Sequence, residues 1–143
     1  MKSCRSPRTI LGRRCSVKNN VSDKRQILGR EGERLAEDYL KKKGYKVLEK
    51  NYRCPLGELD LVVLDGRIIV FVEVKIRSDD RFGHPFEAVH WRKQDKMVKV
   101  ALYFLSQYKL HQREARFDVV GISRGGNNPV IEHVSNAFDL VSR

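Results

Sequence analysis

The chain has 143 residues, 41% of them hydrophobic and 33% charged, which is typical of one globular domain with a single core. It contains no run of about 18 apolar residues, so we expect no membrane-spanning helix. The basic N-terminus also lacks the apolar segment of a signal peptide. Three widely separated cysteines, Cys4, Cys15 and Cys54, match neither a disulfide framework nor zinc spacing. We therefore expect reduced thiols in a cytoplasmic protein.

The net charge of +11 is unevenly distributed along the chain. Residues 1–25 contain eight basic residues and one aspartate, so the rest of the chain carries only +4. Because this segment lacks apolar periodicity, we predict a disordered basic extension over residues 1–25 and a folded domain over residues 26–143. The extension could add contacts to phosphate groups or could serve only as a solubilising tail. The sequence favours neither interpretation.

The folded domain begins with a predicted helix over residues 26–43, where apolar residues recur at helical spacing. Lysines fill its last turn, where they suit the helix dipole, and Gly44 follows as a stop signal. Gly29 and Gly32 are costly inside a helix and indicate that a strand or a phosphate backbone approaches closely. Glu33 could reach a metal directly or through water. It could equally be an acidic residue favoured near a helix N-terminus.

A β-hairpin is predicted over residues 57–77. Asp65-Gly66 indicates a two-residue type I′ turn, which places Glu58 opposite Glu73. Side chains alternate along each strand, so one face is aliphatic and is predicted to be core. The other face carries Glu58, Asp60, Val62, Ile69, Phe71, Glu73, Lys75 and Arg77.

Three carboxylates beside a lysine need an explanation, because like charges across strands destabilise a sheet. A divalent cation provides one, since Mg²⁺ takes oxygen ligands that include one or two protein carboxylates. Asp60 and Glu73 lie diagonally across the strands, and the carbonyl of Val74 could add a third oxygen. Mg²⁺ or Mn²⁺ there would activate a water and polarise a phosphate. Lys75 could orient the attacking water or stabilise the pentacovalent phosphorane.

The alternative for this face is a solvated surface of exposed ion pairs, each contributing little to stability. Further along the chain, a second helix has an apolar stripe and a basic flank. Lys93 and Gln94 near its start could point back over the charged face and contact DNA phosphates, and Arg77 is a third candidate for substrate binding. Lys96 and Lys99 are predicted to be solvated.

The predicted elements alternate between helices and strands. They are helix 26–43, strand 45–52, hairpin 57–77, helix 86–107, strand 115–122 and strand 130–134, with a fraying end or short helix over 136–141. The order α-β-β-β-α-β-β predicts an α/β fold with a mixed central sheet of about five strands flanked by helices.

Four ordered motifs extend the argument beyond single residues. They are GREGERLAEDYLKKKGY (29–45), NYRCPLGELDLV (51–62), FVEVKIR (71–77) and FGHPFEAV (82–89). Together they resemble the YraN family, small bacterial proteins with a restriction-endonuclease-like fold that is similar to that of archaeal Holliday-junction resolvases. The resemblance covers about residues 26–140.

The spacing from Asp60 to Lys75 also resembles the PD-(D/E)xK nuclease core, although Leu59 stands in place of its proline. The resemblance implies metal ligation by Asp60 and Glu73, a catalytic role for Lys75 and a supporting role for Glu33. We therefore expect a Mg²⁺- or Mn²⁺-dependent endonuclease acting on DNA, with branched or junction DNA as a candidate substrate and a homodimer as a candidate assembly.

Two other functions stay open at this point. The protein could bind nucleic acid without cleaving it, or it could dock an acidic protein partner through its basic helix and tail. The complete D…E-x-K set favours the nuclease, because a protein that does not cleave would be free to lose one of the three residues.

Overall fold

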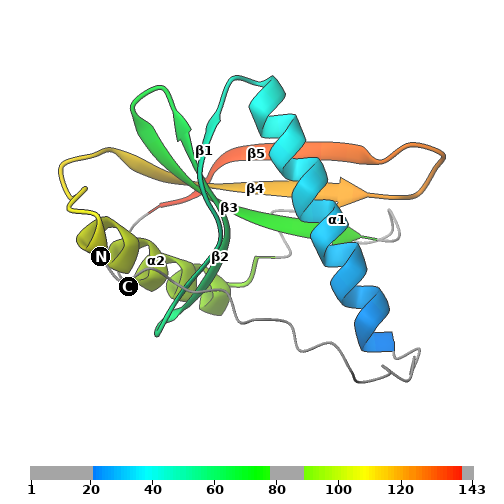
Figure 1. Ribbon diagram of the computed structural model, residues 1–143, viewed down its shortest axis with the longest axis horizontal. Coiled ribbons are helices and arrows are strands. Elements are labelled where there is room, and N and C mark those ends of the chain that lie inside the picture. Colours follow the sequence, from blue (N-terminus) through cyan, green and yellow to red (C-terminus); the bar gives the residue numbers. More distant parts are fainter. Residues whose placement is uncertain (1–20, 78–88, 140–143) are drawn as a thin grey trace, which may run out of the picture.

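The computed structural model describes residues 21–77 and 89–139, and the statements below concern these residues. Five strands form one mixed sheet accompanied by two helices (Figure 1). The elements are α1 (Val21–Lys42), β1 (Lys46–Cys54), β2 (Gly57–Asp65), β3 (Ile68–Arg77), α2 (Trp91–Gln107), β4 (Ala115–Ser123) and β5 (Val130–Phe138). The strands lie side by side in chain order; β3 and β4 are parallel, and the other neighbours are antiparallel. The predicted fold class and element order are confirmed.

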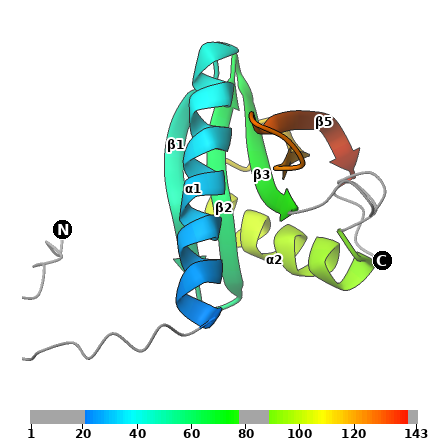
Figure 2. The same ribbon diagram turned by 90° about the vertical axis from the view of Figure 1, so that its right-hand side faces the viewer.

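The sheet is buried on both faces, and each face has its own core. Figures 1 and 2 show α1 lying across the sheet and α2 near one end of it. The α1 core consists of Ala36, Leu40, Leu61, Val63, Val70, Val72, Val120 and Ile122. The α2 core contains Leu59, Val62, Ile69, Phe71, Met97, Ala101, Phe104, Phe117 and Val119 among others. The central residues of β2 and β3 are therefore covered on both faces.

Glycines fix the position of α1 on the sheet. Gly44 has a φ of +92°, and its N–H donates to the carbonyl of Lys41, which ends the helix as predicted. A Cβ on Gly32 would overlap the side chain of Ile76, whereas one on Gly29 would meet nothing within 4 Å. The close neighbour that the sequence indicated at Gly32 is therefore a strand, β3.

The β2–β3 hairpin turns one residue later than predicted, at Gly66-Arg67 instead of Asp65-Gly66. Gly66 has a φ of +59°, and Arg67 has no positive φ, which is the pattern of a type II′ turn with glycine first. The predicted pairing of Glu58 with Glu73 is therefore wrong. Because the register is displaced by two residues, most side chains still lie on their predicted faces.

β2 and β3 separate beyond the Leu61–Val72 pair, and Asp60 lies where they separate. There the carboxylate of Asp60, in place of a backbone carbonyl, accepts the N–H of Val74 at 2.8 Å. The alternation of faces also breaks at this point: Leu59 packs in the α2 core, although it was predicted to share a face with Leu61. The sheet thus opens at the acidic residues.

Several boundaries differ from the predicted ones. Helix α1 begins at residue 21, strand β1 extends to residue 54, and helix α2 begins only at residue 91. Strand β5 continues to residue 138, so the fraying end or short helix predicted over 136–141 is wrong for residues 136–138. Of the basic extension predicted over residues 1–25, residues 21–25 belong to α1, and residues 1–20 lie outside the described residues, as do the start of the second helix at 86–88, Cys4 and Cys15. Neither described helix combines the length and apolarity needed to cross a membrane.

Candidate metal site

The candidate site lies at the end of the sheet where β2 and β3 separate. Asp60 comes from β2, and Glu73 and Lys75 come from β3. Glu73 is only 3% exposed, yet it is a carboxylate on a strand whose other buried side chains are aliphatic or aromatic. A carboxylate buried this deeply requires compensating partners.

Two lysines compensate the charge of Glu73. The ammonium of Lys75 lies 3.0 Å from Oε1, and the ammonium of Lys93 lies 3.4 Å from Oε2. Both lysine side chains are about one-third exposed, so each connects the buried carboxylate with the surface. The contact with Lys93 is an ion pair without a hydrogen bond, and Oε2 is a buried oxygen that accepts none. Within the described residues, Oε2 of Glu73 therefore has an ion-pair partner but no hydrogen-bond donor.

The electrostatic environment of Asp60 favours its protonated form. Burial, the charge of Glu73 and the charge of Glu33 raise the pKa of Asp60 to about 7, although the N–H of Val74 and the ammonium of Lys93 act in the opposite direction. Because the charge of Glu73 opposes the ionisation of Asp60, a cation held by both carboxylates would remove an unfavourable interaction. Glu33 acts on Asp60 through its charge, and its supporting role at the site stays a prediction.

The structure locates the other predicted site residues around this centre. Val74 donates its N–H to Asp60. Gln94 donates its side-chain amide to the carbonyl of Val89 at 3.0 Å, so it bonds to the backbone just before α2. Arg77 lies at the end of β3, and its carbonyl accepts the N–H of Arg124. The predicted substrate contacts of Gln94 and Arg77 stay predictions.

The donor set fits a hard divalent cation. Among the described residues, no cluster of three or more histidine, cysteine, aspartate or glutamate side chains is arranged to hold a metal. Mg²⁺ commonly uses only one or two protein carboxylates and completes its shell with waters and phosphate oxygens. Asp60 and Oε2 of Glu73, which accepts no hydrogen bond from the described residues, would be such ligands. A zinc site of sulfur and nitrogen ligands is not formed by these residues.

A second buried carboxylate was not singled out from the sequence. Asp118 of β4 is fully buried and accepts hydrogen bonds from Arg116, from Nε2 of His133 and from the N–H of Asn136. It lies on the α1 face, opposite the candidate site. Two charged residues at alternate positions of an apolar strand, 116 and 118, were the available signal.

Comparison with known proteins identifies the family. A family model described as Uncharacterised protein family UPF0102 matches residues 32–122. The chain is 51% identical to a UPF0102 protein of Thermodesulfovibrio yellowstonii over 111 residues, which cover 78% of this chain and 95% of that protein. It is 48% identical to a UPF0102 protein of Geobacter metallireducens over 113 residues, 79% of this chain and 93% of that protein. The matched segment includes Glu33, Asp60, Glu73, Lys75 and Lys93. The chain therefore belongs to the UPF0102 family, which is the YraN family that its four motifs resemble.

Proposed function

We propose that this protein is a Mg²⁺- or Mn²⁺-dependent nuclease that hydrolyses phosphodiester bonds in DNA, with branched DNA among its candidate substrates. One observation carries the proposal. Glu73 is a buried carboxylate with an oxygen that accepts no hydrogen bond from the described part of the chain, and it lies beside Asp60, whose pKa is raised to about 7. Such an arrangement is costly for folding and is typical of functional sites.

Each residue has a role that its position supports. Asp60 and Glu73 would hold the cation, and the carbonyl of Val74 would be a third ligand. A bound Mg²⁺ or Mn²⁺ neutralises phosphate charge and lowers the pKa of a coordinated water. Lys75 reaches from the buried Glu73 toward solvent, where its ammonium would orient the attacking water or stabilise the phosphorane. Glu33 would act from α1 through water.

The test is cleavage of labelled four-way, flap, duplex and single-stranded DNA in Mg²⁺ or Mn²⁺. Wild type is compared with Asp60→Asn and Lys75→Ala purified in parallel. Each substitution should reduce the rate by at least about a hundredfold, because each removes a group that acts on the transition state. Asp38→Asn is the matched control, since Asp38 is an exposed carboxylate on α1 and should leave the rate unchanged.

Two readouts separate a catalytic effect from loss of fold. The circular dichroism spectrum should be the same for all four proteins. Mn²⁺ binding measured by calorimetry should be lost in Asp60→Asn and retained in Lys75→Ala, because Asp60 is a proposed ligand and Lys75 is not. Equal cleavage by Asp60→Asn and wild type would refute the site. Binding of DNA without cleavage by wild type would instead favour the non-catalytic binding protein.

A further inference from the structure

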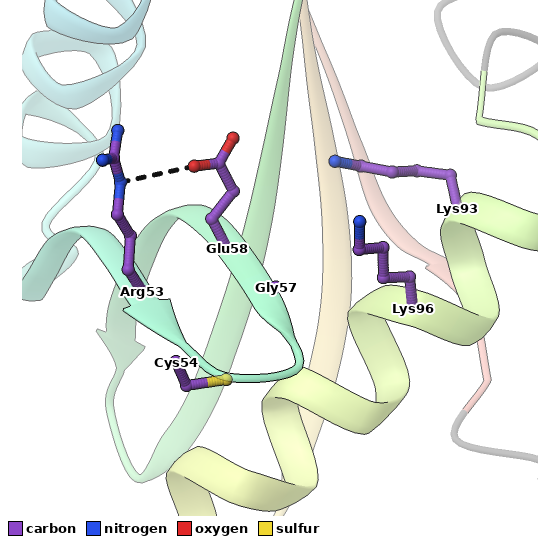
Figure 3. A pocket seen from close by; sticks show the side chains of 6 residues that line it. All are labelled: Arg53, Cys54, Gly57, Glu58, Lys93 and Lys96. Atoms are coloured by element: carbon purple, nitrogen blue, oxygen red, sulfur yellow. Dashed lines mark ion pairs between the residues drawn. The ribbon is translucent and has the colours of Figure 1, made fainter.

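A hollow of about 360 Å³ lies between the β1–β2 turn and α2. Its lining residues are Arg53, Cys54, Gly57, Glu58, Lys93 and Lys96 (Figure 3). Lys93 is shared with the candidate metal site, because its ammonium is ion-paired with Glu73. The hollow therefore adjoins the site where the proposed chemistry takes place.

The turn is held directly against α2. Gly57 has a φ of +146°, which strongly favours glycine, and a Cβ there would lie 2.9 Å from Cε of Lys96 and 3.1 Å from Cγ2 of Val100. The aliphatic part of Lys96 thus packs over the backbone of Gly57. Lys96 was predicted to be a freely solvated lysine, but this packing restricts where its ammonium can point.

The hollow is strongly basic. Three of its lining side chains are cationic, and its single carboxylate, Glu58, lies 3.4 Å from Arg53 in an exposed pair. Figure 3 shows the ends of Lys93 and Lys96 extending from α2 on the same side of the turn as the Arg53–Glu58 pair. Exposed pairs of this kind contribute little to stability, so an incoming anion can replace Glu58 as the partner of Arg53 at small cost.

We propose that this hollow binds a backbone phosphate of the nucleic acid, adjacent to the phosphate that is cleaved. Lys96 and Arg53 are the contacts of this bound phosphate. The inference rests on the proposed function, because it assigns the path of the substrate beside the metal site. Lys93 connects the two positions: it pairs with Glu73 on one side and lines the hollow on the other. A diester phosphate fits because three of the hollow's six lining residues, Arg53, Lys93 and Lys96, are cationic and can bind phosphate oxygens.

The experiment compares two lysines of the same helix. Lys96 and Lys99 are both exposed, but only Lys96 is among the residues that line the hollow. Lys96→Ala and Lys99→Ala are made in the full-length Asp60→Asn protein, so that binding is measured without cleavage. Binding of a fluorescent four-way junction and a fluorescent single strand is followed by fluorescence anisotropy between about 50 and 200 mM salt. Over this range, the loss of one phosphate contact changes the salt dependence of the affinity measurably.

Lys96→Ala should weaken binding by about tenfold and lower the magnitude of the salt slope by about one, as expected for loss of one phosphate contact. Lys99→Ala should change the affinity less than about twofold, although it removes the same charge. Lys96→Arg should retain most of the affinity, because it keeps a cation over the turn. Equal losses for Lys96→Ala and Lys99→Ala would overturn the proposal, since general attraction would then explain both.

Cleavage by the corresponding proteins with Asp60 intact distinguishes this inference from the proposed function. If wild type cleaves DNA and Lys96→Ala binds and cleaves like Lys99→Ala, the nuclease stands and the hollow is not its phosphate site. If wild type neither binds nor cleaves nucleic acid, the proposed function and the inference both fail.

Discussion

The two faces of the sheet carry buried carboxylates with opposite environments. Asp118, on the α1 face, accepts hydrogen bonds from three different residues. Burial alone would raise its pKa, but these donors hold the pKa below its ordinary value. In the candidate site, where Glu73 meets Lys93 of α2, Asp60 has a pKa raised to about 7, and Oε2 of Glu73 accepts no hydrogen bond from the described residues.

The difference indicates what each cluster is for. The Asp118 cluster is complete without any ligand. Nε2 of His133 lies 2.7 Å from Asp118, while Lys43 approaches Nδ1 at 3.2 Å. An ammonium only donates, so Nδ1 accepts and the ring proton lies on Nε2. Every member of this network has a partner that the chain itself supplies. The Asp60–Glu73 pair lacks this completeness, which is the property expected of a site that binds something.

The largest expected effect comes from removing Asp118. Asp118→Ala should lower the free energy of unfolding by about 3–5 kcal/mol, because it leaves the Arg116 guanidinium partly buried with one carboxylate partner fewer. Denaturation with urea at pH 7 measures this loss. The advantage of wild type should shrink below about pH 4, because a carboxylate whose pKa is lowered by folding stabilises the fold fully above the pKa of the unfolded chain and loses that contribution as the pH falls toward the folded pKa.

The matched control for Asp118 is Asp65→Ala, which removes the exposed partner of the same arginine at 2.9 Å. Asp65 is 38% exposed at its side chain, so the loss should be below about 1 kcal/mol. If the two substitutions cost the same, burial and complete hydrogen bonding are not what distinguishes the Asp118 cluster.

A substitution at Asp60 is expected to change the free energy of unfolding in the opposite direction. In the absence of divalent metal, Asp60→Asn should raise the free energy of unfolding at pH 8 by about 1–2 kcal/mol, because it removes a charge whose ionisation the folded state opposes. Since the folded pKa of about 7 exceeds the ordinary value of 3.8, the folded wild type binds more protons than the unfolded chain between these values. Wild-type stability from this group therefore falls as the pH rises from about 4 to 7.

Urea denaturation of both proteins between pH 4 and pH 8 tests this sign. The gain from Asp60→Asn should be near zero at pH 4, grow up to pH 7 and then stay constant. Added Mn²⁺ should reverse the order at pH 8, because only wild type retains both ligands. A gain that does not depend on pH would contradict the raised pKa as its cause.

These contrasts also show what the sequence could and could not predict. Alternation placed Glu73 and Lys75 on one face, where they are ion-paired, even though the predicted turn was wrong, because a displacement of two residues preserves the faces of a hairpin. The break at Leu59 was not predictable, since it depends on the carboxylate of Asp60 bonding to β3 in place of a carbonyl.

Contacts between distant elements were harder still. The sequence indicated that Lys93 could point over the acidic face, but its contact with Glu73 depends on how α2 docks on the sheet. The Asp118 network likewise joins β4 to β5 and to the end of α1 through Lys43. No local pattern specifies these pairings, because they follow from burial of the two cores.

The smallest expected effect concerns Lys93, which compensates Glu73 only partly, at 3.4 Å and without a hydrogen bond. A divalent cation and this ammonium would compete for the same carboxylate oxygen. Lys93→Met keeps the aliphatic length and removes the charge, so it should strengthen Mn²⁺ binding by about threefold to tenfold, the range expected for one moderately exposed charge near the site.

Lys99→Met removes an equal charge from the exposed side of α2 and should change the Mn²⁺ affinity less than about twofold. Calorimetric titration of wild type, Lys93→Met and Lys99→Met with Mn²⁺ at low salt measures the difference in affinity. Cleavage by Lys93→Met should nevertheless fall, because Lys93 also lines the hollow proposed for the phosphate. Weaker Mn²⁺ binding by Lys93→Met than by Lys99→Met would mean that Lys93 positions Glu73 for the metal and does not compete with it.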